Sequence, residues 1–91
     1  MKKHVKNYLK HFSIGEQDVW FCEACGRQFR IDNGLDIHHI IFRSQGGSDD
    51  VENCACLCRK CHTRAHTDLP KSDMQYIHNS FMSGNKKQYL K

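Results

Sequence analysis

The sequence predicts a small α+β fold in which bound metal supplements a thin hydrophobic core. The chain has 91 residues, which suits one domain over residues 1–91 and leaves limited apolar surface to bury. Amphipathic patterns near both ends predict helices, whereas short apolar runs separated by turn signals predict strands between them. The chain also has six cysteines and seven histidines, residue types that supply the metal ligands often needed by so small a domain.

A helix is predicted near each end of the chain. The first covers about residues 3–12, where apolar residues recur with helical spacing. The second covers about residues 72–83 and is expected to begin with a capping box made by Ser72 and Gln75. The glycines expected to end the helices are Gly15 and Gly84, and the buried stripes are Val5, Tyr8, Leu9 and Phe12, then Met74, Ile77 and Phe81.

The middle of the chain, over about residues 20–68, is expected to form the core of the fold. The segment "VWFCEACGRQF" predicts two short strands joined by a Cys-X-X-Cys-Gly turn. A turn at "DNG" precedes "LDIHHIIF", which is apolar and β-branched enough to form the next strand. The segment "SQGGSDD" predicts an exposed loop, and "CHTRAHTD" predicts one or two helical turns ahead of Pro70.

The formal net charge of +4 is unevenly distributed. Residues 1–15 carry four lysines and no acid, and residues 59–91 carry seven lysines or arginines and two acids. Basic ends suit a nucleic acid partner, and a solvated surface is the alternative. The tail over residues 85–91 is expected to be loose. Because no apolar run suits a secretory signal or a membrane span, we expect no membrane association and a reducing, cytoplasmic location.

Two Cys-X-X-Cys pairs stand 32 residues apart, at Cys22 and Cys25 and at Cys58 and Cys61. Four thiolates in two such turns form the closed tetrahedral site of a structural Zn²⁺, which a reducing compartment favours over disulfides. The alternatives are a redox dithiol or ordinary buried cysteines. "CRKCH" also matches a haem-attachment pattern, but covalent haem would leave the first cysteine pair without a role. The remaining cysteines, Cys54 and Cys56, are expected to be small buried side chains.

The histidines form a second pattern. His62 and His66 are four residues apart, so on a helix they lie on one face and can share a metal ion. One histidine of the "HH" pair could complete a site with three imidazoles and open positions. Successive side chains of a strand point to opposite sides, so one of His38 and His39 can be a ligand and the other a base.

The segments "DIHHIIFRSQGG" and "DDVENCACLCRKCHTRAH" resemble the HNH endonuclease family over about Cys22 to His66. The tandem histidines are similar to those of the DNase colicins, and the cysteine layout resembles phage-borne and restriction-type members. The resemblance implies a ββα-metal (His-Me finger) core with treble-clef-like zinc knuckles, flanked by the N- and C-terminal helices. It also implies a bacterial or phage-infected host cell.

The resemblance implies a role for each matching residue. His39 would be the general base, Asn53 would hydrogen-bond to the base and orient it, and His62 would belong to the catalytic set. The catalytic metal ligands would be His38, His62 and His66, and the structural zinc ligands would be Cys22, Cys25, Cys58 and Cys61. Asp36 would orient a ligand or remain a solvated acid, and Arg43 is a candidate for holding a substrate phosphate. Phe42 stands where many members have proline, and Cys54 where many have leucine. His4, His11 and His78 lie outside the motif and are expected to be ordinary surface or core histidines.

The implied function is a divalent-metal-dependent DNA endonuclease that leaves 5′-phosphate and 3′-hydroxyl ends. The catalytic ion would be Mg²⁺, Mn²⁺, Ni²⁺, Co²⁺ or Zn²⁺, and three imidazoles favour the last four over Mg²⁺. Weak sequence preference, or targeting by a partner such as the terminase or portal proteins of phage packaging, is expected. The alternatives are a non-catalytic zinc module that binds DNA or a protein, and a redox protein.

Overall fold

The computed structural model describes residues 2–84, so the basic tail over 85–91 lies outside the described residues. The chain has helices, antiparallel strands and short 3-10 helices (η), as the α+β class predicts. In order they are α1 (Lys3–Phe12), β1 (Val19–Phe21), β2 (Gln28–Arg30), β3 (Leu35–His39), η1 (Arg43–Gln45), η2 (Val51–Asn53), β4 (Cys54–Cys58), α2 (Arg59–Ala65) and α3 (Lys71–Met82). The predicted fold class, with a helix on either side of a central ββα unit, is therefore confirmed.

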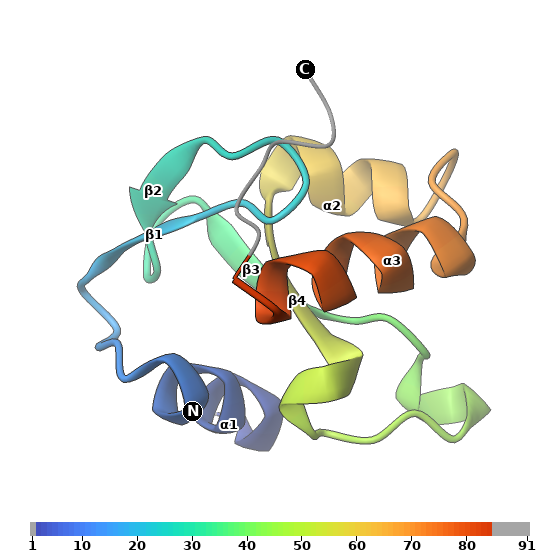
Figure 1. Cartoon of the computed structure of the whole chain (residues 1–91), viewed down its shortest axis with the longest axis horizontal. Helices are drawn as coiled ribbons and strands as arrows, with labels where there is room; N and C mark the ends of the chain where they lie inside the picture. Colours follow the sequence, from blue (N-terminus) through green and yellow to red (C-terminus); the bar gives the residue numbers. More distant parts are fainter. Residues whose placement is uncertain (1, 85–91) are drawn as a thin grey trace.

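The strands form two antiparallel hairpins. In the first, β1 pairs with β2 around the Cys22–Cys25 turn. In the second, β3 pairs with β4 in a register that sets Leu35 opposite Cys58 and His39 opposite Cys54. Helix α2 continues directly from one end of this second hairpin, and α1 lies near the other end (Figure 1). The β3–β4 hairpin and α2 thus form the ββα unit on which both histidine pairs stand.

The strand that carries the tandem histidines is shorter than predicted. It ends at His39, and the N–H of Ile40 donates to the carbonyl of Asn53 at 2.8 Å. The chain then turns, so that Ile41 is exposed and η1 begins at Arg43. An apolar, β-branched run cannot by itself show where such a strand stops, because the stop depends on the loop that returns to Asn53.

The hydrophobic core lies around β4, whose five residues are all buried. The predicted stripes of the terminal helices cover it, and Tyr8, Leu57 and Met74 are among its least exposed members. Phe12 of α1 and Phe81 of α3 pack edge to face with ring centroids 5.7 Å apart. An aromatic contact of this kind contributes about 0.5–1.5 kcal/mol beyond the burial of its area.

Two helix boundaries differ from the prediction. Helix α1 ends at Phe12 and is capped by Ser13, which adopts a left-handed conformation (φ 55°), so Gly15 is not its stop signal. Helix α3 begins at Lys71 after Pro70, and the predicted capping box does not form. The carbonyl of Pro70 already accepts the first helical N–H bond, at 3.0 Å from Met74, so the helix starts before Ser72 can cap it. The side chain of Gln75 instead donates to the carbonyl of Glu52.

A buried polar network joins the elements through Glu23, whose residue surface is 4% exposed. Its carboxylate accepts hydrogen bonds from the Tyr8 hydroxyl at 2.5 Å, the Cys56 N–H at 3.0 Å and Nδ1 of His78 at 2.7 Å. Nε2 of His78 donates in turn to the carbonyl of Val51 at 2.6 Å. The network ties α1, the first cysteine turn, β4 and α3 together. His78 is therefore a buried core histidine, whereas His11 is exposed.

No helix within residues 2–84 is long and apolar enough to cross a membrane.

Candidate active site and metal centres

The four predicted zinc ligands lie together. Cys22 and Cys25 occupy the turn after β1, where Gly26 adopts φ 76° and its N–H donates to the carbonyl of Cys22 at 2.8 Å. Cys58 ends β4 and Cys61 lies in the first turn of α2, and ligand atoms of all four cysteines lie within 4.8 Å of one another. The Sγ atoms of Cys25 and Cys58 are 3.9 Å apart. A tetrahedral site with Zn–S bonds of about 2.3 Å has sulfur–sulfur edges of about 3.8 Å, so this cluster suits structural Zn²⁺.

Burial shapes the acidity of these thiols. It raises the pKa of Cys22 to about 11 and also raises that of Cys61. Burial opposes ionisation of Cys58 too, but hydrogen bonds from the backbone and side chain of Cys61 and from neighbouring thiols lower its pKa overall. Three of the four cysteines are buried and Cys25 is half-buried, so a bound cation is what would favour the thiolate form of all four together. Cys54 and Cys56 are fully buried, and burial raises the pKa of Cys54 to about 12.

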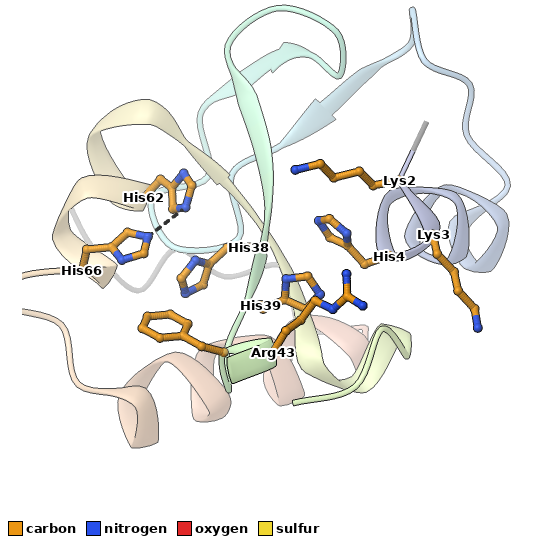
Figure 2. A pocket seen from close by; sticks show the side chains of 9 residues that line it. Lys2, Lys3, His4, His38, His39, Arg43, His62 and His66 are labelled. Atoms are coloured by element: carbon orange, nitrogen blue, oxygen red, sulfur yellow. Dashed lines mark hydrogen bonds between the residues drawn. The ribbon is translucent and has the colours of Figure 1, made fainter. Parts of the chain in front are cut away.

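The second cluster consists of His38, His62 and His66. His38 points from β3 toward α2, and its ring centroid lies 5.0 Å from that of His62 and 5.2 Å from that of His66 (Figure 2). The Nε2 atoms of His62 and His66 are 3.2 Å apart. Imidazole nitrogens about 2.1 Å from a shared ion stand about 3.0–3.4 Å apart in octahedral or tetrahedral geometry, so this pair fits one metal ion.

The surroundings of His38 favour its neutral form, which can bind a cation. Burial, followed by the neighbouring imidazoles of His62 and His66, lowers the pKa of His38 to about 4. His38 is therefore neutral at neutral pH and has a lone pair to offer, as a metal ligand requires. Phe42 covers one side of the cluster: its ring stacks on that of His66 with centroids 5.4 Å apart and meets that of His38 edge to face.

Asp36 contacts the cluster through His62. Its Oδ2 accepts a hydrogen bond from Nδ1 of His62 at 3.0 Å and lies 3.0 Å from Nε of Arg59. The bond places the proton of His62 on Nδ1 and leaves Nε2 to face His66. Asp36 thus contacts His62 and Arg59 and is partly exposed, and its role as an orienting acid stays a prediction.

His39 lies on the opposite side of β3, as strand alternation predicts. Nε2 of His39 donates to Oδ1 of Asp49 at 2.8 Å, and its ring lies against that of His4 with centroids 4.1 Å apart. Nε of Arg43 lies 3.9 Å from the same Asp49 oxygen. The tandem histidines therefore belong to two different groups, one facing α2 and one facing α1 (Figure 2).

Asn53 does not make the contact that the resemblance implies. Its side chain accepts from the N–H of Ile41 at 2.8 Å and donates to the carbonyls of Ile41 at 3.0 Å and Ser48 at 2.8 Å. Within the described residues its side chain has no hydrogen bond to His39. The physical reason is that the chain leaves the β3–β4 pairing after His39 and folds back over Asn53. The amide of Asn53 then supplies the hydrogen bonds that the backbone of this loop no longer makes to a neighbouring strand. Asn53 thus fixes the loop, and any effect on His39 is indirect.

Gly47 belongs to the same loop. A Cβ atom at this position would lie 1.7 Å from the carbonyl oxygen of Ile41 and 3.0 Å from Nδ2 of Asn53. Only glycine allows this approach. The sequence analysis did not identify Gly47, His4 or Asp49 as parts of the site. For Gly47 and Asp49 the available signal was the pair of glycines just before the two acids. For His4 there was no local signal, because its hydrogen bond to the carbonyl of Ile37 spans 33 residues.

Both histidine groups open into one cavity of about 510 Å³. Besides the histidines and Phe42, its lining includes the basic side chains of Lys2, Lys3 and Arg43 (Figure 2). Arg43 is thus placed beside the base candidate, with its side chain 71% exposed. A cavity that combines positive charge with a cluster of side chains able to hold a metal ion suits a phosphate-containing ligand.

Comparison with known proteins gives several matches. The type IV methyl-directed restriction enzyme EcoKMcrA of Escherichia coli K12 is 36% identical over 70 residues, which cover 71% of this chain and 25% of that protein. The probable mobile endonuclease C of enterobacteria phage T4 is 53% identical over 38 residues, which cover 42% of this chain and 18% of the relative. Anaredoxin of a Nostoc species is 36% identical over 53 residues, which cover 58% of this chain and 66% of the relative. The chain thus spans a quarter or less of the two nucleases.

A family comparison matches residues 22–68 to the HNH endonuclease family. The match starts at the first cysteine of the zinc cluster, ends just after His66 and covers more than half of the chain. The chain therefore belongs to the HNH endonuclease family.

Proposed function

We propose that this chain is a divalent-metal-dependent endonuclease that hydrolyses phosphodiester bonds of DNA, with residues 1–91 acting as one nuclease domain. The observation that carries the proposal is the division of the tandem histidines between two groups that share one cationic cavity. One group fits a metal ion, and the other presents a hydrogen-bonded imidazole beside it. A module that only binds zinc needs neither.

His38, His62 and His66 would hold the catalytic ion. When bound there, a divalent ion supplies Lewis-acid stabilisation of the phosphate and of the departing oxygen. Three imidazole ligands favour Mn²⁺, Co²⁺, Ni²⁺ or Zn²⁺ over Mg²⁺, which prefers oxygen ligands. The cysteine cluster would hold a separate structural Zn²⁺ and would take no part in the reaction.

His39 would act as the general base. Its Nε2 already donates to Asp49, so Nδ1 is the ring atom left to accept a proton from water. Asn53 contributes by holding the loop that leads from His39 to Arg43, and so fixes the position of the arginine relative to the base. Hydrolysis would leave a 5′-phosphate and a 3′-hydroxyl.

Lys2, Lys3 and Arg43 would contact the phosphates on either side of the scissile bond. Contacts to the backbone position DNA but carry no sequence information, so we expect weak sequence preference from this chain alone. A protein partner, such as a component of phage packaging machinery, would then supply the targeting.

The experiment is cleavage of supercoiled plasmid by the full chain with each of Mg²⁺, Mn²⁺, Co²⁺, Ni²⁺ and Zn²⁺, with EDTA as a control. We expect nicked or linear product with at least one ion, none with EDTA, and none from His62→Ala. His11→Ala is the matched control because His11 is exposed and lies outside the cavity. The product should religate without kinase treatment. An intact plasmid with every ion, together with retained DNA binding, would support the non-catalytic zinc module instead.

A further inference from the structure

We propose that Asp49 and His4 are positioning residues that hold the imidazole of His39 in one orientation and one tautomer, which makes α1 part of the active site. The inference rests on the proposed role of His39 as the general base. Residues 1–21, which include His4, lie outside the family match. The proposal therefore assigns a function to a segment that the family motif does not reach.

Asp49 fixes the tautomer. An ionised carboxylate only accepts hydrogen bonds, so the 2.8 Å contact between Oδ1 and Nε2 of His39 places the ring proton on Nε2. The hydrogen bond from His39 holds the pKa of Asp49 below its ordinary value, so the carboxylate is charged at neutral pH. Asp49 is itself held in place, because its backbone carbonyl accepts a hydrogen bond from Nδ2 of Asn7 at 2.9 Å.

His4 fixes the ring plane. Its side chain lies in the first turns of α1, is buried, and packs against the ring of His39 at an interplanar angle of 37°. Nε2 of His4 donates to the carbonyl of Ile37 at 3.0 Å, on the same strand two residues before His39. Burial, followed by the nearby His39, lowers the pKa of His4, so it packs as a neutral ring. Helix α1 therefore contacts β3 through His4 and the loop after β3 through Asn7, so it binds the chain both before and after His39.

The same three side chains also offer metal-ligand atoms within 4.8 Å of one another, so a metal ion is the competing explanation. The hydrogen bonds argue against it. Nε2 of His4 donates to the carbonyl of Ile37, and Nε2 of His39 donates to Asp49. One nitrogen of each ring is therefore hydrogen-bonded without an ion, whereas the Nε2 atoms of His62 and His66 lie 3.2 Å from each other, as two ligands of one ion would.

The test compares Asp49→Asn, Asp49→Glu and the matched control Asp50→Asn. Asp50 is the neighbouring exposed acid, and within residues 2–84 its side chain makes no hydrogen bond or ion pair with His39. We expect Asp49→Asn to slow single-turnover plasmid cleavage about 10–100-fold at saturating metal, with unchanged plasmid affinity. Asp49→Glu should recover part of the rate, and Asp50→Asn should match wild type. His4→Ala should slow cleavage about tenfold or more, with His11→Ala as its control.

A spectroscopic readout separates positioning from general stability. Nitrogen-15 chemical shifts of the imidazoles in the zinc-loaded protein should show His39 with its proton on Nε2 in wild type and Asp50→Asn, and a mixture of tautomers in Asp49→Asn. Wild-type cleavage and an unchanged tautomer in Asp49→Asn, with His39→Ala inactive, would overturn this inference alone. Active His39→Ala would overturn the proposed base and this inference together. Fewer bound metal ions in His4→Ala or Asp49→Asn would show a metal site in place of a positioning contact.

Discussion

Replacing Glu23 with glutamine perturbs the buried network that links α1, the first cysteine turn, β4 and α3. Both nitrogens of His78 donate to oxygen acceptors, at 2.7 Å to Glu23 and 2.6 Å to Val51, so the ring is an imidazolium facing a carboxylate. Glutamine can still accept from Tyr8 and Cys56 through its one oxygen, but it presents N–H groups to His78. The variant therefore removes the only anion that contacts this buried cation within the described residues.

The cost follows from burial. The side chains of Glu23 and His78 are both 0% exposed, and breaking such a pair from one side costs about 3–5 kcal/mol. Loss of the proton from His78 would relieve part of this, leaving about 1–3 kcal/mol for the unmade hydrogen bond. We expect a loss of about 3 kcal/mol in the free energy of unfolding, which is a large share of the stability of a domain this size.

The pH dependence has a definite sign. Burial lowers the pKa of His78, but the hydrogen bond and charge of Glu23 and the carbonyl of Val51 outweigh it, so the pKa is raised above 6.5. The native state then binds more protons than the unfolded state in this range. The stabilisation is complete below about pH 6.5 and is lost as pH rises through the pKa of the folded protein. Glu23→Gln should abolish that part of the slope.

Urea unfolding at fixed free zinc, followed through the fluorescence of Trp20, measures both effects. Trp20 is the one tryptophan of the chain, and its indole N–H donates to the hydroxyl of Tyr8, next to Glu23. Glu16→Gln, at an exposed acid, is the matched control and should change stability by less than about 0.5 kcal/mol. A loss below about 1 kcal/mol in Glu23→Gln, or an unchanged slope between pH 6 and 8, would refute the reasoning.

Three further predictions concern the metal centres and the loop. Asp36→Ala should weaken metal binding at the histidine cluster about 10–100-fold, because His62 loses its Nδ1 acceptor; calorimetric titration measures this, with the exposed Asp32→Ala as control. Gly47→Ala should cost about 2 kcal/mol or more, since its Cβ would collide with the carbonyl of Ile41, whereas Gly15→Ala, with ordinary contacts, should cost far less in the same unfolding assay. Elemental analysis should find that Cys58→Ser loses the structural zinc, and that the His38/His62/His66 triple-alanine variant keeps it. Unchanged metal affinity in Asp36→Ala would contradict the first prediction, and an unchanged free energy of unfolding in Gly47→Ala would contradict the second. Loss of all zinc from the triple-alanine variant would contradict the third.

Sequence reasoning reached the features that local spacing determines. Helical periodicity located both terminal helices, the paired cysteines indicated the zinc cluster, and strand alternation separated His38 from His39. The spacing within a helix, within one cysteine pair and along a strand involves neighbours a few residues apart, where local geometry is nearly constant. The meeting of the two cysteine pairs across 32 residues is shown by the structure. The roles of the site residues stay predictions, although the structure brings the three proposed metal ligands together.

The remainder depends on contacts between distant segments. Glu23 meets His78 across 55 residues and His4 meets Ile37 across 33, so no local pattern indicates either contact. Asn53 illustrates the limit of a motif: the residue is present, but its partners are set by the path of the loop over Gly47. The capping box does not form for a local reason, because Pro70, two residues before Ser72, is already the N-cap of α3.

The central claim is that the tandem histidines divide metal binding from proton transfer, and the most direct test is the single-turnover cleavage rate of His39→Ala at equal metal occupancy. We expect this variant to bind the same number of metal ions as wild type and to cleave plasmid about 10²–10⁴-fold more slowly. Cleavage within about threefold of wild type, or loss of the ion expected at His38, His62 and His66, would contradict it.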